Sequence, residues 1–126
     1  MKIVLFLAFI IGLASAANWA VIVAGSNTYS NYRHQSDVFH AYQILKRNNF
    51  DPEHIITFAY DDIANNSRNP FRGKVFNKPT YKEPGVDVYA GVKIDYSGAS
   101  VTPTMFQNVL EGNKTKGMGK VLESTS

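Results

Sequence analysis

The chain has 126 residues, enough for one small domain, and its hydrophobic content of 44% is that of a globular protein rather than a disordered one. The formal net charge is only +3, and the Lys and Arg residues form no stripe, which argues against a nucleic-acid partner. The chain contains no cysteine, and therefore no disulfide, no thiol nucleophile and no thiolate metal ligand. We expect no cofactor.

The first sixteen residues have the three-part form of a secretory signal peptide. Lys2 gives a positive start, an apolar run follows over residues 3–13, and the small residues at 14–16 suit a signal peptidase. The apolar run is shorter than the roughly 20 residues that a membrane-spanning helix needs. The sequence therefore predicts a signal peptide over 1–16, a mature chain over 17–126 in the secretory pathway, and no membrane attachment after the signal is removed.

A continuous apolar run over Trp19–Ala24 predicts a central strand of a parallel sheet that helices cover on both faces. Residues 25–27 end the strand, and a polar loop follows that carries Asn31, Arg33 and His34. In open α/β sheets, ligands bind just beyond the carboxyl ends of the strands. We therefore expect this loop to contribute to a functional site.

A helix and a second strand come next. The helix is expected to begin at a cap formed by Ser36 or Asp37 and to end at Asn48 and Asn49, which tolerate the left-handed conformation. The segment His54–Tyr60 is mostly apolar and β-branched or aromatic, which predicts a strand. Strand, helix and strand then make one βαβ unit with parallel strands. The apolar face of the helix recurs at helical spacing in Val38, Ala41, Tyr42 and Leu45.

From residue 61 to about residue 100, prolines and glycines are frequent, and we expect a long surface loop with a short hairpin around 86–92. Thr102 and Pro103 predict the cap and first turn of a second helix, which Gly112 or Asn113 ends. The remaining residues are polar and predict no third strand. The first strand would therefore have a bare edge, which indicates an incomplete domain or one completed by a partner.

Four blocks of the sequence resemble the legumain family of asparaginyl endopeptidases, which are caspase-like cysteine peptidases. In chain order they are WAVIVAGSNTYSNYRHQSDVFHAY, ITFAYDDIANNSRNP, GVDVYAGVKIDYSG and VTPTMFQNVLEGNK. The resemblance covers Trp19 to about Lys120 in order and at family-like spacing. It implies a caspase-like α/β/α sandwich with a mainly parallel central sheet. By this resemblance, residues 17–126 are the N-terminal portion of a legumain-type peptidase domain, truncated after two strands.

The resemblance also implies an activity. In the family, the residue at Asn31 orients the catalytic imidazole, and those at Arg33 and His34 line the pocket for the substrate's Asn side chain. The implied substrates are peptides and proteins cleaved after Asn, and less readily after Asp. The implied location is an acidic lumenal compartment such as a lysosome or vacuole, or outside the cell. The family's histidine in a His-Gly-Gly turn and its cysteine nucleophile have no counterpart here, so we expect no peptidase activity from this chain alone.

Two other functions stay open from the sequence. One is a catalytically dead secreted module that binds Asn-containing peptides or an intact relative. The other is a metal-dependent α/β protein that uses Asp61 and Asp62, which follow the second strand. We favour an interpretation in which these aspartates cap the loop and pair with a nearby base, because no phosphate-binding glycine loop accompanies them.

Two further histidines and two sequons complete the candidate sites. His40 is expected in the middle of a helix and His54 at the start of a strand, a poor arrangement for ligands, so we expect no metal. The sequons at Asn65 and Asn113 predict N-glycosylation once the chain has entered the secretory pathway.

Overall fold

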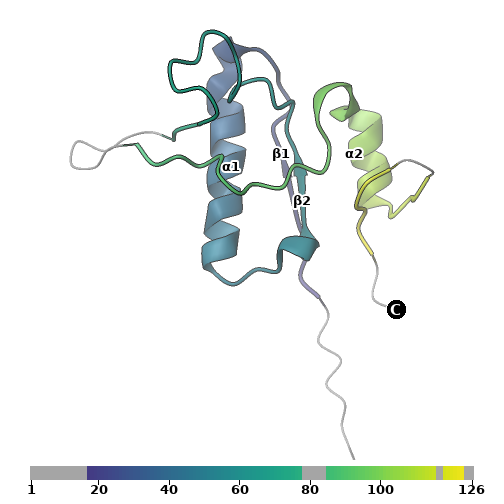
Figure 1. The fold of residues 1–126 in the computed structure, drawn as a ribbon. Helices are drawn as coiled ribbons and strands as arrows, with labels where there is room; N and C mark the ends of the chain where they lie inside the picture. The colour runs from purple at the N-terminus through teal and green to yellow at the C-terminus, as the bar shows by residue number, and fades with distance from the viewer. Residues whose placement is uncertain (1–16, 78–84, 116–117, 124–126) are drawn as a thin grey trace, which may run out of the picture.

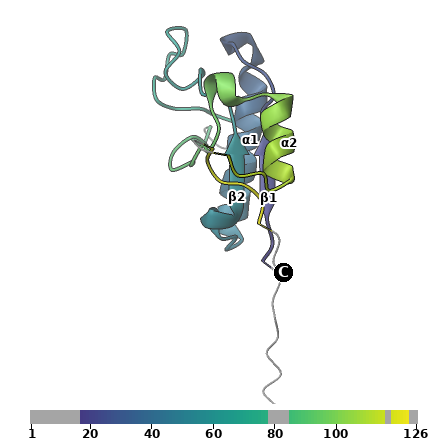
Figure 2. The same cartoon turned by 90° about the vertical axis from the view of Figure 1, so that its right-hand side faces the viewer.

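The computed structural model describes residues 17–77, 85–115 and 118–123, so the expected signal peptide over 1–16 lies outside the described residues. Two parallel strands form a central layer between two helices, one on each face (Figure 1, Figure 2). This confirms the predicted α/β/α arrangement, with two strands in this chain. The elements are β1 (Ala20–Val23), η1 (Tyr29–Asn31), α1 (Tyr32–Arg47), η2 (Pro52–His54), β2 (Ile55–Phe58), η3 (Gly98–Ser100) and α2 (Pro103–Leu110), where η marks a 3-10 helix.

Strand β2 has a backbone neighbour on each side. It pairs in parallel with β1, placing Ala20 opposite Ile55 and Val23 opposite Phe58. On the other side of β2, Tyr96 forms an isolated parallel bridge with Phe58, and every residue of β2 is buried. The sequence predicted both strands, and within the described residues the first one has β2 as its single neighbour.

The outer edge of β1 is open. Within the described residues β1 pairs only with β2, and Val23 at its end is 40% exposed. A groove opens beside Val23 on each face of the sheet, one of about 480 Å³ toward α1 and one of about 280 Å³ toward α2. The bare edge expected from the sequence is thus confirmed for the described part of the chain.

Two hydrophobic clusters join the layers, one on each face of the sheet. Toward α1, Phe39 packs with Ala24 and Ile63. Toward α2, Phe58 packs with Val109. Phe39 and Phe58 are both fully buried, and burial of a side chain of this size contributes about 1.5–3 kcal/mol. The two clusters therefore fix both helices on the sheet and position the loops at its carboxyl edge.

Helix α1 begins earlier than the sequence predicted. Ser36 and Asp37 were expected to cap it, but they lie inside it, and the cap residue is Asn31. The turn of η1 leads directly into Tyr32, so the helix continues from a 3-10 turn without a side-chain cap. Asn48 is the C-terminal cap residue and Asn49 has a φ of 58°, so the predicted helix end is confirmed.

The segment from 61 to 100 was expected to be a surface loop, and this is wrong for much of it. Ile63, Val75 and Val88 are at most 3% exposed and belong to the cluster that packs on α1. Asn69 holds the segment together, because its Nδ2 donates to the carbonyls of residues 63, 64 and 74 at 2.9–3.2 Å. In place of the expected hairpin around 86–92, the described residues contain one antiparallel bridge, between residues 76 and 87.

Helix α2 begins as predicted. Pro103 occupies the first turn, and the Thr102 hydroxyl accepts a hydrogen bond from the Met105 amide at 3.1 Å. The helix ends at Leu110, and Gly112 follows with a φ of 68°. Residues 118–123 contain no strand but return across the sheet, where Val121 is 3% exposed and packs beside α2.

Candidate functional site

Asn31, Arg33 and His34 lie where the sequence predicted, just beyond the carboxyl end of β1. Arg33 and His34 lie in the first turn of α1 rather than in a loop, and Asn31 is the cap residue that ends η1 before it. The Asn31 side chain donates from Nδ2 to the carbonyl of Asn27 at 2.9 Å. Its Oδ1 has no hydrogen-bond partner among the described residues, which leaves a carboxamide oxygen able to accept a hydrogen bond.

The two residues expected to contact substrate differ in their surroundings. Arg33 is exposed, and within the described residues its guanidinium forms no ion pair. His34 is half-buried, with its Nδ1 2.5 Å from the Ser26 hydroxyl, and it lines the 480 Å³ groove between β1 and α1. The structure therefore brings His34 to a groove and leaves Arg33 facing solvent beside it.

The aspartates that follow β2 bind the loop that follows β1. The Asp62 carboxylate accepts from the Thr28 amide at 2.6 Å and from Gln35 Nε2 at 2.7 Å. Gln35 is 1% exposed, and its Oε1 accepts from the Asp61 amide at 3.1 Å. The expected pairing of these aspartates with a base is wrong for the described residues, because Asp62 is held by neutral N–H donors.

Two tyrosines support the site from either side of it. Tyr89 donates a hydrogen bond to the Asp61 carboxylate at 2.9 Å, and burial together with this contact raises the Tyr89 pKa to about 12. Tyr32, in the first turn of α1, accepts from the Phe76 amide at 2.6 Å, and burial raises its pKa. Sequence reasoning missed Gln35 and both tyrosines, because each partner lies at least 26 residues away along the chain.

The remaining predicted sites take no part in the contacts described above. Asn65 and Asn113 carry the sequons, and the Asn65 side chain is exposed, as a glycosylation acceptor must be. His54 lies 3.6 Å from the Asp51 carboxylate, and its ring packs edge-on against Trp19. The described residues contain no group of three or more His, Cys, Asp or Glu side chains that could hold a metal ion.

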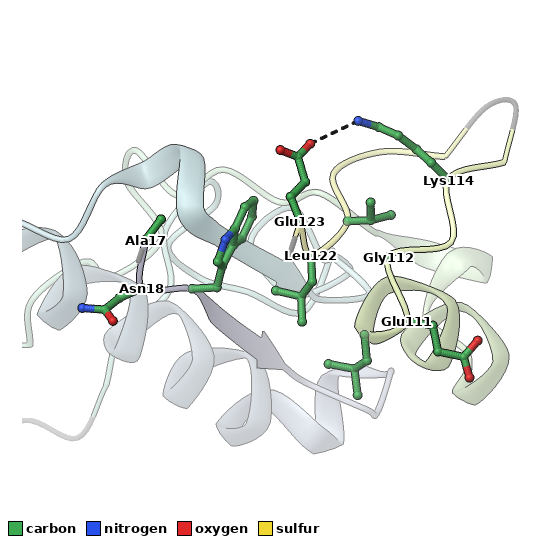
Figure 3. A pocket seen from close by; sticks show the side chains of 10 residues that line it. Ala17, Asn18, Glu111, Gly112, Lys114, Leu122 and Glu123 are labelled. Carbon is green, nitrogen blue, oxygen red and sulfur yellow. Dashed lines mark hydrogen bonds and ion pairs between the residues drawn. The ribbon is translucent and has the colours of Figure 1, made fainter. Parts of the chain in front are cut away.

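A further cavity lies at the opposite edge of the sheet, next to Trp19, and has a volume of about 700 Å³. Figure 3 shows Lys114 and Glu123 paired on its rim, where their charged atoms are 3.4 Å apart. This cavity lies at the amino end of β1, and none of its lining residues belongs to the group around Asn31 and His34. It therefore takes no part in the candidate site.

The fold and the polar residues beyond its strands agree with a comparison of the sequence with known families. The model of the peptidase C13 family matches residues 18–126, and the chain belongs to this family of cysteine peptidases. The chain is 58% identical over 106 residues to the hemoglobinase of Schistosoma japonicum, covering 84% of this chain and 24% of that protein. It is 55% identical over 111 residues to the legumain of Rattus norvegicus, covering 85% and 25%.

Plant relatives show the same pattern. The chain is 54% identical over 109 residues to the vacuolar-processing enzyme of Vicia sativa, covering 84% of this chain and 21% of that enzyme. The chain thus spans about a quarter of the length of the curated relatives it matches. Among the described residues, no helix combines the length and the apolar character that crossing a membrane requires.

Proposed function

We propose that this chain forms part of a legumain-type cysteine endopeptidase that cleaves peptide bonds after Asn, and less readily after Asp. The observation that carries this proposal is the position of Asn31, Arg33 and His34. They follow β1 at the ligand-binding edge of the sheet, in a chain that is 55% identical to rat legumain over 111 residues.

The chemistry of these side chains suits an Asn substrate. A carboxamide presents one acceptor oxygen and one donor nitrogen. Arg33 offers fixed N–H donors to the oxygen, and its exposed guanidinium is available for this contact. His34 adds a polar atom beside the groove, while an acidic partner for the substrate nitrogen comes from elsewhere in the enzyme. We assign to Asn31 Oδ1 the role of accepting from the N–H of a catalytic imidazole and so orienting it; the hydrogen bond from Asn31 Nδ2 to the Asn27 carbonyl, which leaves Oδ1 free among the described residues, supports this role.

The reacting groups themselves are not among these 126 residues. The sequence contains no cysteine, and its histidines at 34, 40 and 54 include none in a His-Gly pair. Because a thiolate and its base are both needed for attack, the chain alone is inactive. In a protein of the relatives' length, the strand that carries the base adds at the open edge of β1, where grooves lie on both faces.

The route and location follow from the same assignment. Residues 1–16 direct the chain into the secretory pathway and are removed, after which Asn65 and Asn113 are glycosylated. Two of the relatives named above are a legumain and a vacuolar-processing enzyme, which supports an acidic lysosomal or vacuolar compartment.

The experiment is an NMR titration of the 126-residue chain with acetyl-Gly-Asn-amide, using acetyl-Gly-Leu-amide as the matched ligand. We expect the Asn ligand alone to shift the Arg33 and His34 signals, with a dissociation constant of about 1 mM because only part of the pocket is present. Arg33→Ala removes the response, and the exposed control Lys93→Ala retains it. Equal responses to both ligands, or an unchanged response in Arg33→Ala, would contradict the proposal. The same chain should release no product from an Asn-containing peptide.

A catalytically dead module that binds Asn-containing peptides is the second candidate, and the groove of about 480 Å³ that His34 lines favours it. Such a module has a complete pocket, so it binds the Asn ligand at micromolar rather than millimolar concentration. The titration therefore separates the two candidates by the affinity of the unmodified chain.

A further inference from the structure

Thr28 has a backbone conformation that its side chain disfavours. Its φ of 72° and ψ of 151° fall in a region that glycine occupies almost alone, and a β-branched residue there is a genuine outlier. Such a conformation persists only where neighbouring contacts enforce it. Thr28 lies in the short connection between β1 and α1, three residues before Asn31, so whatever enforces it also sets the start of the helix.

The contact that enforces it comes from the loop after β2. The Thr28 amide donates to Asp62 Oδ2 at 2.6 Å, and the Thr28 carbonyl accepts from the Asn31 amide at 3.0 Å. One peptide unit on each side of Thr28 is therefore fixed, the first by a carboxylate and the second by Asn31, the cap residue of α1. An N–H bond to a carboxylate is shorter and stronger than one to a neutral acceptor.

A second set of hydrogen bonds, through Gln35, joins the same two loops and fixes which groups donate and which accept. The Asp61 amide is a fixed donor, so the oxygen of the Gln35 side chain must face it, and the Gln35 nitrogen must then face Asp62. Thr28 offers a second fixed donor to Asp62. Asp62 thus receives two donors and offers none. While residue 35 is Gln, only a side chain with two acceptor oxygens at position 62 completes the series from the Asp61 amide through Gln35 and Asp62 to the Thr28 amide.

From this arrangement we infer that Asp62, acting with Gln35, is a positioning residue for the substrate pocket: it holds Thr28 in its strained conformation and so sets the direction in which Arg33 and His34 leave α1. The inference rests on the proposed function for the roles of Arg33 and His34. The bridge itself, meaning the hydrogen bonds of Asp62 and Gln35 that join the loops after β1 and β2, is tested without any substrate.

The test swaps the carboxylate at position 62 and the carboxamide at position 35, because the fixed donors at Asp61 and Thr28 tolerate only certain combinations of the two. Asp62→Asn places an amide where two acceptors are needed, so one donor faces another whichever way the amide turns. Gln35→Glu alone brings two carboxylates together. The double variant Asp62→Asn, Gln35→Glu restores every hydrogen bond. In it, the new carboxylate at position 35 accepts from the Asp61 amide and from the new carboxamide at position 62, and the oxygen of that carboxamide still accepts from the Thr28 amide.

The matched control is Asp61→Asn, which changes the adjacent carboxylate but keeps the Asp61 amide and the contact with the Tyr89 hydroxyl. The readouts are the hydrogen-exchange rate of the Thr28 amide and the side-chain NMR shifts of His34. We expect Asp62→Asn to speed Thr28 exchange at least about 10-fold and to move the His34 signals, because two N–H donors then face each other and one hydrogen bond of the bridge is lost. The double variant should return both readouts to near those of the unmodified chain, with exchange within about 3-fold, because each lost bond is replaced.

Each outcome decides the matter. A double variant that exchanges as fast as Asp62→Asn overturns the inference, and so does an Asp62→Asn variant that behaves like the control. If Asp62→Asn does not fold, a cooperative melt in the double variant supports the bridge, and an unfolded double variant overturns it. If the double variant restores slow hydrogen exchange of the Thr28 amide while acetyl-Gly-Asn-amide shifts no signal in any variant, the bridge is supported and the proposed function is contradicted.

Discussion

The buried ion pair between Lys120 and Asp95 gives the sharpest stability prediction. The Lys120 side chain is 15% exposed and that of Asp95 is 5% exposed, with Nζ and Oδ1 3.7 Å apart. Lys120 Nζ also donates to the carbonyls of Pro52 and Ile55 at 3.0 and 2.9 Å, while Asp95 accepts from the Thr57 amide. The pair thus ties the returning segment 118–123 to the start of β2.

Replacing Lys120 with Met keeps most of the apolar stem but removes the charge. The Asp95 carboxylate is then left buried without its cation, and two backbone carbonyls lose a donor. Loss of one partner from a buried pair costs about 3–5 kcal/mol, a large share of the roughly 5–15 kcal/mol that stabilises a small domain. The matched control is Lys93→Met, since Lys93 pairs with Glu53 at 3.3 Å but both side chains are more than half exposed. Its cost is about 0–1 kcal/mol.

The assay is urea unfolding of the unmodified chain and the two variants, monitored by circular dichroism. The three curves are fitted with one shared dependence of the free energy of unfolding on urea concentration. Lys120→Met should lose several times more free energy of unfolding than Lys93→Met. Equal losses in the two variants would refute the reasoning, because they would show that segment 118–123 contributes no more to the fold than an exposed contact does.

Three further predictions concern pH, association and strain. The Tyr89 pKa is raised from 10.0 to about 12 in the folded chain, so the stability that Tyr89 contributes is complete below pH 10 and is lost as the pH rises through 12. Between pH 10 and pH 12, the free energy of unfolding should therefore fall less in Tyr89→Phe than in the unmodified chain. An equal fall in both proteins would argue against the contact with Asp61. Val23→Lys on the open edge should lower the associated fraction measured by light scattering, whereas Ile44→Lys, at a similarly exposed position on α1, should leave it unchanged; the reverse order would exclude edge pairing. Thr28→Gly should stabilise the chain by about 1 kcal/mol in thermal unfolding. The substitution removes about 1–3 kcal/mol of backbone strain and costs about 0.5–1 kcal/mol, because glycine loses more conformational entropy on folding. A loss of stability would show that the φ of 72° is not strained.

The parts of the fold that the sequence predicted are those with local causes. Thr102 caps α2 because its hydroxyl reaches an amide three residues later, and Asn49 ends α1 because its own backbone accepts a positive φ. Both strands could be predicted because their apolar β-branched runs are short and continuous. Each of these signals lies within a few residues of the feature it determines.

The parts that were missed depend on partners distant in the sequence. Ile63, Val75 and Val88 show no common period, and they are buried because α1 and the sheet lie over them. No sequence pattern set Gln35 apart from the polar residues before the expected helix cap, although it is 1% exposed and joins residues 61 and 62. Asn31 was placed correctly beyond the first strand, yet its place as the cap of α1 depends on η1, which no sequence pattern marked.

The most direct measurement is the activity of a chimera in which the matching 111-residue stretch of rat legumain is replaced by this chain's own residues. If the stretch supplies Asn31 and the pocket residues, the chimera should cleave a peptide after Asn and leave the matching Leu peptide intact. Arg33→Ala in the chimera should then lower kcat/KM at least about 10-fold, as loss of a charge-assisted hydrogen bond predicts, while Lys93→Ala retains it. A folded chimera that cleaves neither peptide, or both equally, would contradict the account.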